Sequence, residues 1–146
     1  MENLEDFENK FSMKIDSKLI NESFIRSMVA TFCIQLNPSM SEVNDIKTAV
    51  SEAVTNSIVH GYSNGDGEIE VFVGIKNKTI FIKISDEGAG IENIEKARQP
   101  FFTTKSNEER SGMGFTLMES FMDSLKVYNN NQKGVSVEMT KEIKSF

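Results

Sequence analysis

Two runs of alternating apolar residues, joined by a short turn, restrict the fold of this chain more than any other feature. Residues 69–75 place Ile or Val at every second position, and residues 80–84 do the same with Ile. This period is typical of a strand with one buried face, and Asn77-Lys78 between the runs predicts a hairpin whose strands pair antiparallel. A sheet with one apolar face must be covered by a second layer.

Two amphipathic helices precede the hairpin and can form that layer. The first is predicted to start with Asn21 as its N-cap and to end at Asn37-Pro38. The second is predicted from about Ser41 to His60, where Gly61 stops it. The expected buried residues are Phe24, Ile25, Met28, Val29, Phe32, Cys33 and Leu36 in the first helix and Val43, Ile46, Val50, Ala53, Val54 and Ile58 in the second.

The remaining segments complete one sheet. Further strands are predicted around residues 11–15, 125–128 and 135–140, with a turn at 129–134, a short helix at 91–97 and a helix that opens at Gly112-Met113-Gly114. The expected architecture is α+β: a two-layer sandwich of a mixed, mostly antiparallel sheet with helices on one face, in a single domain over residues 1–146. Residues 98–112 show little apolar periodicity and are predicted to form a mobile lid.

Composition excludes several classes of function. The net charge is −6 and no Lys/Arg stripe is present, so direct nucleic-acid binding is not expected. The single cysteine allows neither an internal disulfide nor a cysteine-rich zinc site. No apolar run approaches the roughly 20 residues that cross a bilayer, and the acidic N-terminus is unlike a signal peptide. The expectation is a cytoplasmic protein without membrane contact.

A polar stripe on the second helix is the first candidate site. Glu52, Asn56 and His60 are spaced four apart and therefore project from one side of the helix. The Asn56 amide oxygen suits Mg²⁺, which usually takes one or two protein ligands together with phosphates. Glu52 could orient or deprotonate an attacking hydroxyl or water. By itself, this spacing also fits a solvated helix face.

Two glycine-containing loops are the other candidates. Asp86 ends a predicted strand and is followed by Gly88 and Gly90, which allow the backbone to approach a ligand closely. The Asp86 carboxylate could accept a hydrogen bond from the exocyclic amine of adenine. Gly112-Met113-Gly114 lies at a helix start, where free N–H groups can hold phosphate. Taken singly, these loops also fit a tight turn and an ordinary helix cap.

The order and spacing of the three elements resemble the Bergerat ATP-binding pattern of the gyrase, heat-shock chaperone, histidine-kinase and MutL ATPases. Longer segments, at residues 52–62, 97–105 and 109–115 and in Asn21-Glu22-Ser23-Phe24-x-Arg26, are similar to the anti-sigma F factors of endospore formers. The similarity covers nearly the whole chain. It implies an ATP-dependent protein-serine kinase that sequesters the sporulation sigma F factor from RNA polymerase and phosphorylates an anti-anti-sigma factor on serine.

The resemblance also implies a role for individual residues. Glu52 would be the catalytic base, Asn56 the Mg²⁺ ligand and Asp86 the adenine contact. The other residues expected to bind ATP are Gly88 and Gly90 around the base, Gly112, Met113 and Gly114 at the phosphates, Thr103, Thr104, Lys105 and Arg110 in the lid, and Ser136 near adenine. Glu22 and Arg26 are candidate partner contacts, although their spacing also fits an exposed ion pair within the helix. A homodimer is expected.

Several alternatives stay open. The chain could be an anti-sigma B type stress-response kinase, or an ATP-gated module that binds a sigma factor with negligible kinase activity. A detached catalytic domain of a sensor histidine kinase is a third possibility. Such kinases carry their phosphoacceptor on a separate helical hairpin that this chain is too short to contain, so His60 is expected to have a structural or supporting role.

Overall fold

The computed structural model describes residues 6–99 and 114–145. In chain order its elements are β1 (Asn9–Asp16), α1 (Asn21–Cys33), the 3-10 turn η2 (Ile34–Leu36), α2 (Met40–Asn56), the π-helical turn η3 (Ser57–Gly61), β2 (Glu68–Lys76), β3 (Thr79–Ser85), α3 (Ile94–Ala97), α4 (Gly114–Phe121), β4 (Ser124–Asn129) and β5 (Val135–Glu142). Of the predicted lid, Arg98 and Gln99 are described and the rest lies outside these ranges.

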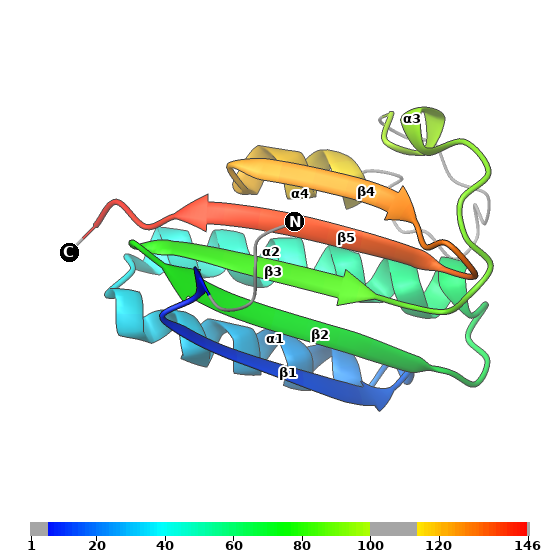
Figure 1. Cartoon of the computed structure of the whole chain (residues 1–146), viewed down its shortest axis with the longest axis horizontal. Coiled ribbons are helices and arrows are strands. Elements are labelled where there is room, and N and C mark those ends of the chain that lie inside the picture. Colours follow the sequence, from blue (N-terminus) through cyan, green and yellow to red (C-terminus); the bar gives the residue numbers. More distant parts are fainter. Residues whose placement is uncertain (1–5, 100–113, 146) are drawn as a thin grey trace.

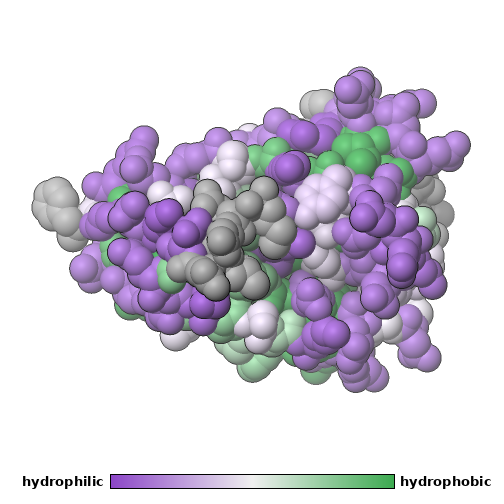
Figure 2. All heavy atoms as spheres, in the orientation of Figure 1, coloured by the Kyte–Doolittle hydropathy of each residue, from purple (hydrophilic) through white to green (hydrophobic). Residues whose placement is uncertain are grey.

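The strands form one sheet in the order β1-β2-β3-β5-β4. Helices α1, α2 and α4 cover one face of this sheet, and the other face carries mostly hydrophilic residues (Figures 1 and 2). The α+β two-layer prediction is therefore confirmed. Every described strand pairing is antiparallel, so the sheet is more uniform than the mixed sheet that was expected.

The hairpin predicted at Asn77-Lys78 is confirmed. Both residues have positive φ, 49° and 67°, and Lys76 pairs with Thr79 across the turn. Positive φ at both central residues is the geometry of the type I′ turn, whose twist matches that of the flanking strands. The turn thereby fixes the register that points the alternating Ile and Val residues of β2 and β3 at the helices.

The core lies between the sheet and the helices. Ile25 and Val29 of α1, Ile46 and Val50 of α2 and Met139 of β5 are fully buried there. Cys33 also lies in this core as predicted, and burial raises the pKa of its thiol to about 11. Its role is packing.

Helix α1 differs from its prediction in two respects. Asn21 is the first helical residue instead of the cap, and its Nδ2 donates to the Asp16 carbonyl at 2.9 Å. Phe24 was expected in the buried stripe but is 51% exposed, because the stripe that faces the core runs through Ile25, Val29 and Cys33. The first turn of α1 therefore presents apolar surface outward.

Helix α2 begins with a capping box and ends in a wider turn. The Ser39 hydroxyl accepts from the Glu42 amide at 3.1 Å, and the Glu42 carboxylate accepts from the Ser39 amide at 2.9 Å. At the other end, the helix predicted to run to His60 becomes the π-helical turn η3, and the Tyr62 amide donates back to the Ser57 carbonyl at 3.0 Å. Such turns are frequent at functional sites.

Among the described helices, none has the combined length and apolar character needed to cross a bilayer.

Candidate functional site

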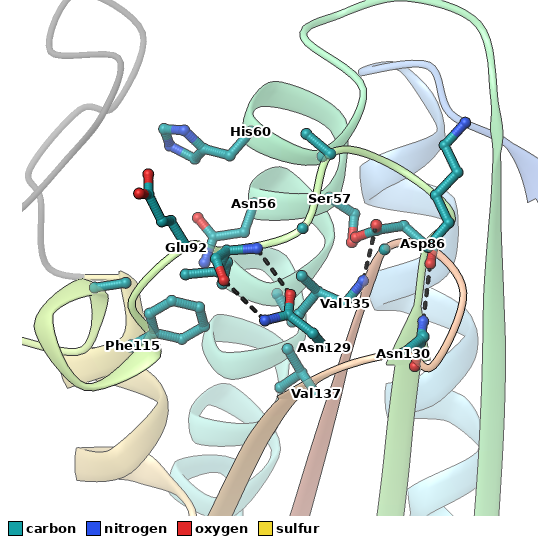
Figure 3. Close-up of a pocket in the computed structure, with 18 of the residues that line it drawn as sticks. Asn56, Ser57, His60, Asp86, Glu92, Phe115, Asn129, Asn130, Val135 and Val137 are labelled. Atoms are coloured by element: carbon teal, nitrogen blue, oxygen red, sulfur yellow. Dashed lines mark hydrogen bonds between the residues drawn. The ribbon is translucent and has the colours of Figure 1, made fainter.

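A cavity of about 1010 Å³ opens beside the C-terminal end of α2. Three parts of the fold line it: the end of α2 with η3, the loop after β3 together with α3, and the region where the β4–β5 turn faces α4. Figure 3 shows Asn56, Asp86 and Phe115 converging on this space from different elements. Its volume is at the upper end of the roughly 300–1,000 Å³ that is usual for small-molecule sites.

The polar stripe of α2 meets the start of α4 at this cavity. A Cβ atom added to Gly114 would lie 3.3 Å from Asn56 Nδ2 and 3.4 Å from Glu52 Oε2. The two side chains predicted to act together therefore lie side by side against the first residue of α4. Asn56 borders the cavity directly, whereas Glu52 is half-buried one turn earlier.

Asp86 is a buried carboxylate at the opposite wall, with only 4% of its surface exposed. Its Oδ1 accepts from the amides of Gly88 at 2.9 Å and Val135 at 3.2 Å. Burial raises the pKa of Asp86, while these bonds and one from the Ser57 hydroxyl oppose the rise. Because the backbone bonds fall on Oδ1, Oδ2 keeps lone pairs for a donor in the cavity.

The loop that follows Asp86 is tightly packed against η3. A Cβ atom on Gly88 would lie 2.1 Å from the Gly61 carbonyl oxygen, so no other residue fits there without a backbone shift. That same oxygen accepts from the Ala89 amide at 2.8 Å. Gly90 has φ +81°, a conformation that side-chain-bearing residues rarely adopt. The two glycines are needed for different reasons.

Comparison with known proteins assigns the chain to a family. Residues 16–141 match the sequence model of the family described as histidine kinase-like ATPase domain. The anti-sigma F factor of Thermoanaerobacter sp. strain X514 is 53% identical over 140 residues, which cover 96% of this chain and 98% of that relative. The chain belongs to the anti-sigma F factor family. Another member, from Clostridium acetobutylicum, is 50% identical over 92% of this chain and 94% of its own length.

Solved structures show that the fold of this anti-sigma F family member is shared more widely. The RsbU and RsbW domains of Rv1364c from Mycobacterium tuberculosis match with a TM-score of 0.65 and 15% identity, over 92% of this chain and 32% of that one. The catalytic domain of the histidine kinase ThkA matches with a TM-score of 0.53 and 18% identity, over 90% of this chain and 97% of that one. At these identities the likeness concerns the fold alone.

Asn129, the last residue of β4, and Asn130, which follows it in the β4–β5 turn, join the site of this family member, although both were predicted to belong to the turn. The Asn129 side chain accepts from the Ile91 amide and donates to the Ile91 carbonyl, both at 2.8 Å. Asn130 Nδ2 donates to the Asp86 carbonyl at 3.1 Å (Figure 3). An asparagine run in a turn is the one signal that could have pointed to these contacts.

Ser136 is not among the residues that line the cavity, and its contact with adenine stays a prediction. Alternate residues of a strand face opposite sides of the sheet, and in β5 it is Val135 and Val137 that line the cavity. The Ser136 hydroxyl instead donates to Asn130 Oδ1 at 2.6 Å and lies 2.9 Å from the Ser85 hydroxyl. It supports the turn from the other face of the sheet.

The rim of the cavity carries charged residues that the sequence did not single out. Glu92 and Lys96 line it together with His60, and Figure 3 shows the Glu92 carboxylate directed toward the His60 ring. Among the described residues, no three His, Cys, Asp or Glu side chains lie close enough to hold a metal ion. A metal in this part of the site would therefore depend on the Asn56 amide and on phosphates of a bound ligand.

The other predicted contacts of this family member divide into two groups. Thr103, Thr104, Lys105, Arg110, Gly112 and Met113 lie outside the described residues. Glu22 and Arg26 lie on α1, where Arg26 Nε is 3.5 Å from Glu22 Oε2. Both atoms are buried, and neither has a hydrogen-bond partner within the described part of the chain. Their contact with each other is the ion pair within the helix that the spacing also allowed.

Proposed function

We propose that this chain is an ATP-dependent protein-serine kinase and anti-sigma factor. It sequesters the sporulation sigma F factor from RNA polymerase and phosphorylates an anti-anti-sigma factor on serine. One observation carries the proposal: Asp86, Asn56 and Gly114 converge on one cavity in a chain that is 53% identical to an anti-sigma F factor over nearly its whole length.

The cavity offers different chemistry at its two ends. Asp86 Oδ2 is suited to accept a hydrogen bond from the exocyclic amine of adenine. The ring can pack against the apolar part of the lining, which consists of Ala53, Ala89, Ile91, Ala97, Phe115, Val135 and Val137. At the other end, Gly114 brings the start of α4 to Asn56, where phosphates meet free N–H groups and a helix dipole.

Asn56 would hold Mg²⁺ through its amide oxygen. When bound, this ion neutralises charge on the phosphates. Glu52, which lies beside Asn56 against Gly114, would take the proton of the incoming serine hydroxyl. The serine oxygen then forms a bond to the γ-phosphorus, the bond from that phosphorus to the β–γ bridging oxygen breaks, and ADP leaves.

Helix α1 supports the assignment of protein partners. Arg26 pairs with Glu22 and keeps 36% of its side-chain surface exposed, and rim charges of this kind govern encounter and specificity. Leu19 and Ile20, just before this pair, are 63% and 81% exposed. We propose this end of α1 as a contact for sigma or the anti-anti-sigma factor, and a homodimer as the working form.

A transfer assay tests the proposal. The purified chain is incubated with Mg²⁺, γ-labelled ATP and the anti-anti-sigma factor, and acid-stable label is expected on a serine of the partner. ATP binding without label on the partner would contradict the kinase activity and would favour an ATP-gated module that binds a sigma factor. Acid-labile label on a histidine would indicate a histidine kinase. Co-purification of sigma F in preference to sigma B distinguishes the sporulation factor from the stress-response type.

A further inference from the structure

The loop between β3 and α3 forms one wall of the cavity and has no regular structure of its own. Beyond Asp86, three hydrogen-bonded attachments join it to other described parts of the fold. The Glu87 amide donates to the Tyr62 hydroxyl at 2.7 Å, the Ala89 amide donates to the Gly61 carbonyl at 2.8 Å, and Ile91 is bound by Asn129. Of these three, the last lies beyond Gly90, on the side that leads to α3.

The attachment at Ile91 is made entirely by one side chain. Asn129 Oδ1 accepts from the Ile91 amide and Asn129 Nδ2 donates to the Ile91 carbonyl, so both backbone groups of one residue are satisfied by one amide. Oδ1 also lies 3.0 Å from the position that a Cβ of Gly90 would take. The amide therefore fits closely against the turn of the chain at Gly90.

Ile91 is where this attachment can affect a ligand. It belongs to the apolar lining together with Val135 and Val137, and it is followed directly by Glu92 and Asn93 on the rim. We propose that Asn129 is a positioning residue for the nucleotide: by fixing the Ile91 backbone it sets the apolar wall on which the base packs. This inference rests on the proposed ATP-binding function.

Asn129 and its neighbour Asn130 bind different ends of the loop between β3 and α3. Asn130 binds the Asp86 carbonyl and the Ser136 hydroxyl, and so belongs to the support of the carboxylate. Asn129 binds the opposite end of the loop and is itself exposed to solvent. Its substitution should therefore alter the wall of the cavity with little effect on global stability.

The test compares Asn129→Ala with Asn131→Ala, a matched change at an exposed position two residues later, in the β4–β5 turn. Dissociation constants for Mg-ATP and Mg-ADP are measured by calorimetry. Loss of the two hydrogen bonds should weaken both nucleotides by roughly 5- to 20-fold, to the same extent because the base is common to them. In the transfer assay KM for ATP should rise while kcat stays within about twofold. Asn131→Ala should bind like the parent.

Two further measurements separate positioning from general destabilisation. Hydrogen exchange of the Ile91 amide in the nucleotide-free protein should become faster in Asn129→Ala at an almost unchanged Tm. Asn129→Asp retains the shape and the acceptor but places a carboxylate oxygen against the Ile91 carbonyl, so it should bind no better than the alanine variant. Parent-like nucleotide affinity in either variant would overturn the proposal, as would a loss of affinity that follows a fall in Tm.

The parent protein provides the separate test of the function on which this inference rests. If the parent binds neither nucleotide, the proposed ATP-dependent function fails, and with it the role of Asn129. If the parent binds and Asn129→Ala binds equally well, the function stands and the positioning role alone is wrong.

Discussion

At the scale of single residues, Asp86 has two carboxylate oxygens in different environments. Oδ1 accepts from two backbone amides, and Oδ2 lies within 3.0 Å of the place where a Cβ of Gly61 would be. In Asp86→Asn, the side-chain oxygen can still accept from the backbone, but an NH₂ group replaces the second acceptor. Hydrogen bonds to charged groups contribute about 1.5–3 kcal/mol, so nucleotide affinity should fall roughly 10- to 100-fold in calorimetry. Asp66→Asn, at an exposed loop position, is the control and should bind normally.

Substitution of Glu52 should lower the rate of phosphotransfer without weakening nucleotide binding. It contacts Asn56 and the start of α4 without lining the cavity itself, so Glu52→Gln should change nucleotide affinity by no more than about threefold. Removal of a general base costs roughly 10²- to 10⁴-fold in rate, and kcat for phosphotransfer should fall by that amount. Glu95→Gln, on the exposed side of α3, should transfer phosphate normally. Parent-level kcat in Glu52→Gln would show that another group takes the proton.

These residues also show what sequence reasoning can and cannot find. Glu52 and Asn56 were predictable because helical spacing fixes which side chains share a face, and Asp86 because it ends a strand whose alternation is strict. The contact between Asn129 and Ile91 was not predictable, because it joins the end of β4 to an irregular loop and depends on side-chain orientation. The role of Ser136 was carried over by resemblance and stays a prediction, while strand alternation directs its hydroxyl to Asn130.

At the scale of elements, the start of α2 is tied to the C-terminal segment through Glu42. Partial burial works to raise the pKa of Glu42, but hydrogen bonds from the Ser145 hydroxyl and from the amides of Ser39 and Lys144 outweigh it and lower the pKa from 4.5 to about 2. A carboxyl group whose pKa is lower in the folded state stabilises the fold above its unfolded pKa. This stabilisation is lost as the pH falls from about 4.5 toward 2.

Glu42→Gln should therefore lower the free energy of unfolding near neutral pH by about 1 kcal/mol, the usual scale for a cap interaction. The difference between the parent and the variant should shrink below pH 4.5 and disappear near pH 2. Urea unfolding at a series of pH values measures it. Glu68→Gln, at an exposed position on β2, should show no such pH-dependent difference. A constant difference across the range would mean that ionisation of Glu42 does not contribute.

The elements themselves were largely predictable, and their ends were not. Period-two and helical patterns placed the five strands and the long helices, because each has one face in the core. The π-helical turn at Ser57–Gly61 has no such signature in the sequence. Its last residue, Gly61, packs against Gly88 and accepts a hydrogen bond from Ala89, and these residues are distant in the chain. The exposure of Phe24 likewise depends on the rotation of α1 against the sheet, which a single apolar stripe does not specify.

At the scale of the whole molecule, ligand binding should raise the melting temperature of the fold. A ligand that binds only the folded chain stabilises it by about 2.7 kcal/mol at a concentration of 100 times its Kd, which corresponds to a rise in Tm of roughly 5–10 °C for a chain of this size. Mg-ATP should give this rise in a thermal melt. GTP should give much less at the same concentration, because guanine presents a carbonyl acceptor where adenine presents an amine to Asp86. An equal rise with GTP would contradict recognition of the base by this carboxylate.

The position of β5 in the sheet has a consequence for how the protein is made. This strand, Val135–Glu142, is the last in the chain, yet it lies between β3 and β4 and supplies the amide that binds the Asp86 carboxylate. On the ribosome, β3 and Asp86 emerge well before the partner that holds them, and pairings between such distant segments form slowly. A nascent or truncated chain that lacks β5 has neither the completed sheet nor the fixed carboxylate. Nucleotide binding is therefore expected only once β5 has paired with β3, and its gain during synthesis would mark the moment when the sheet is completed.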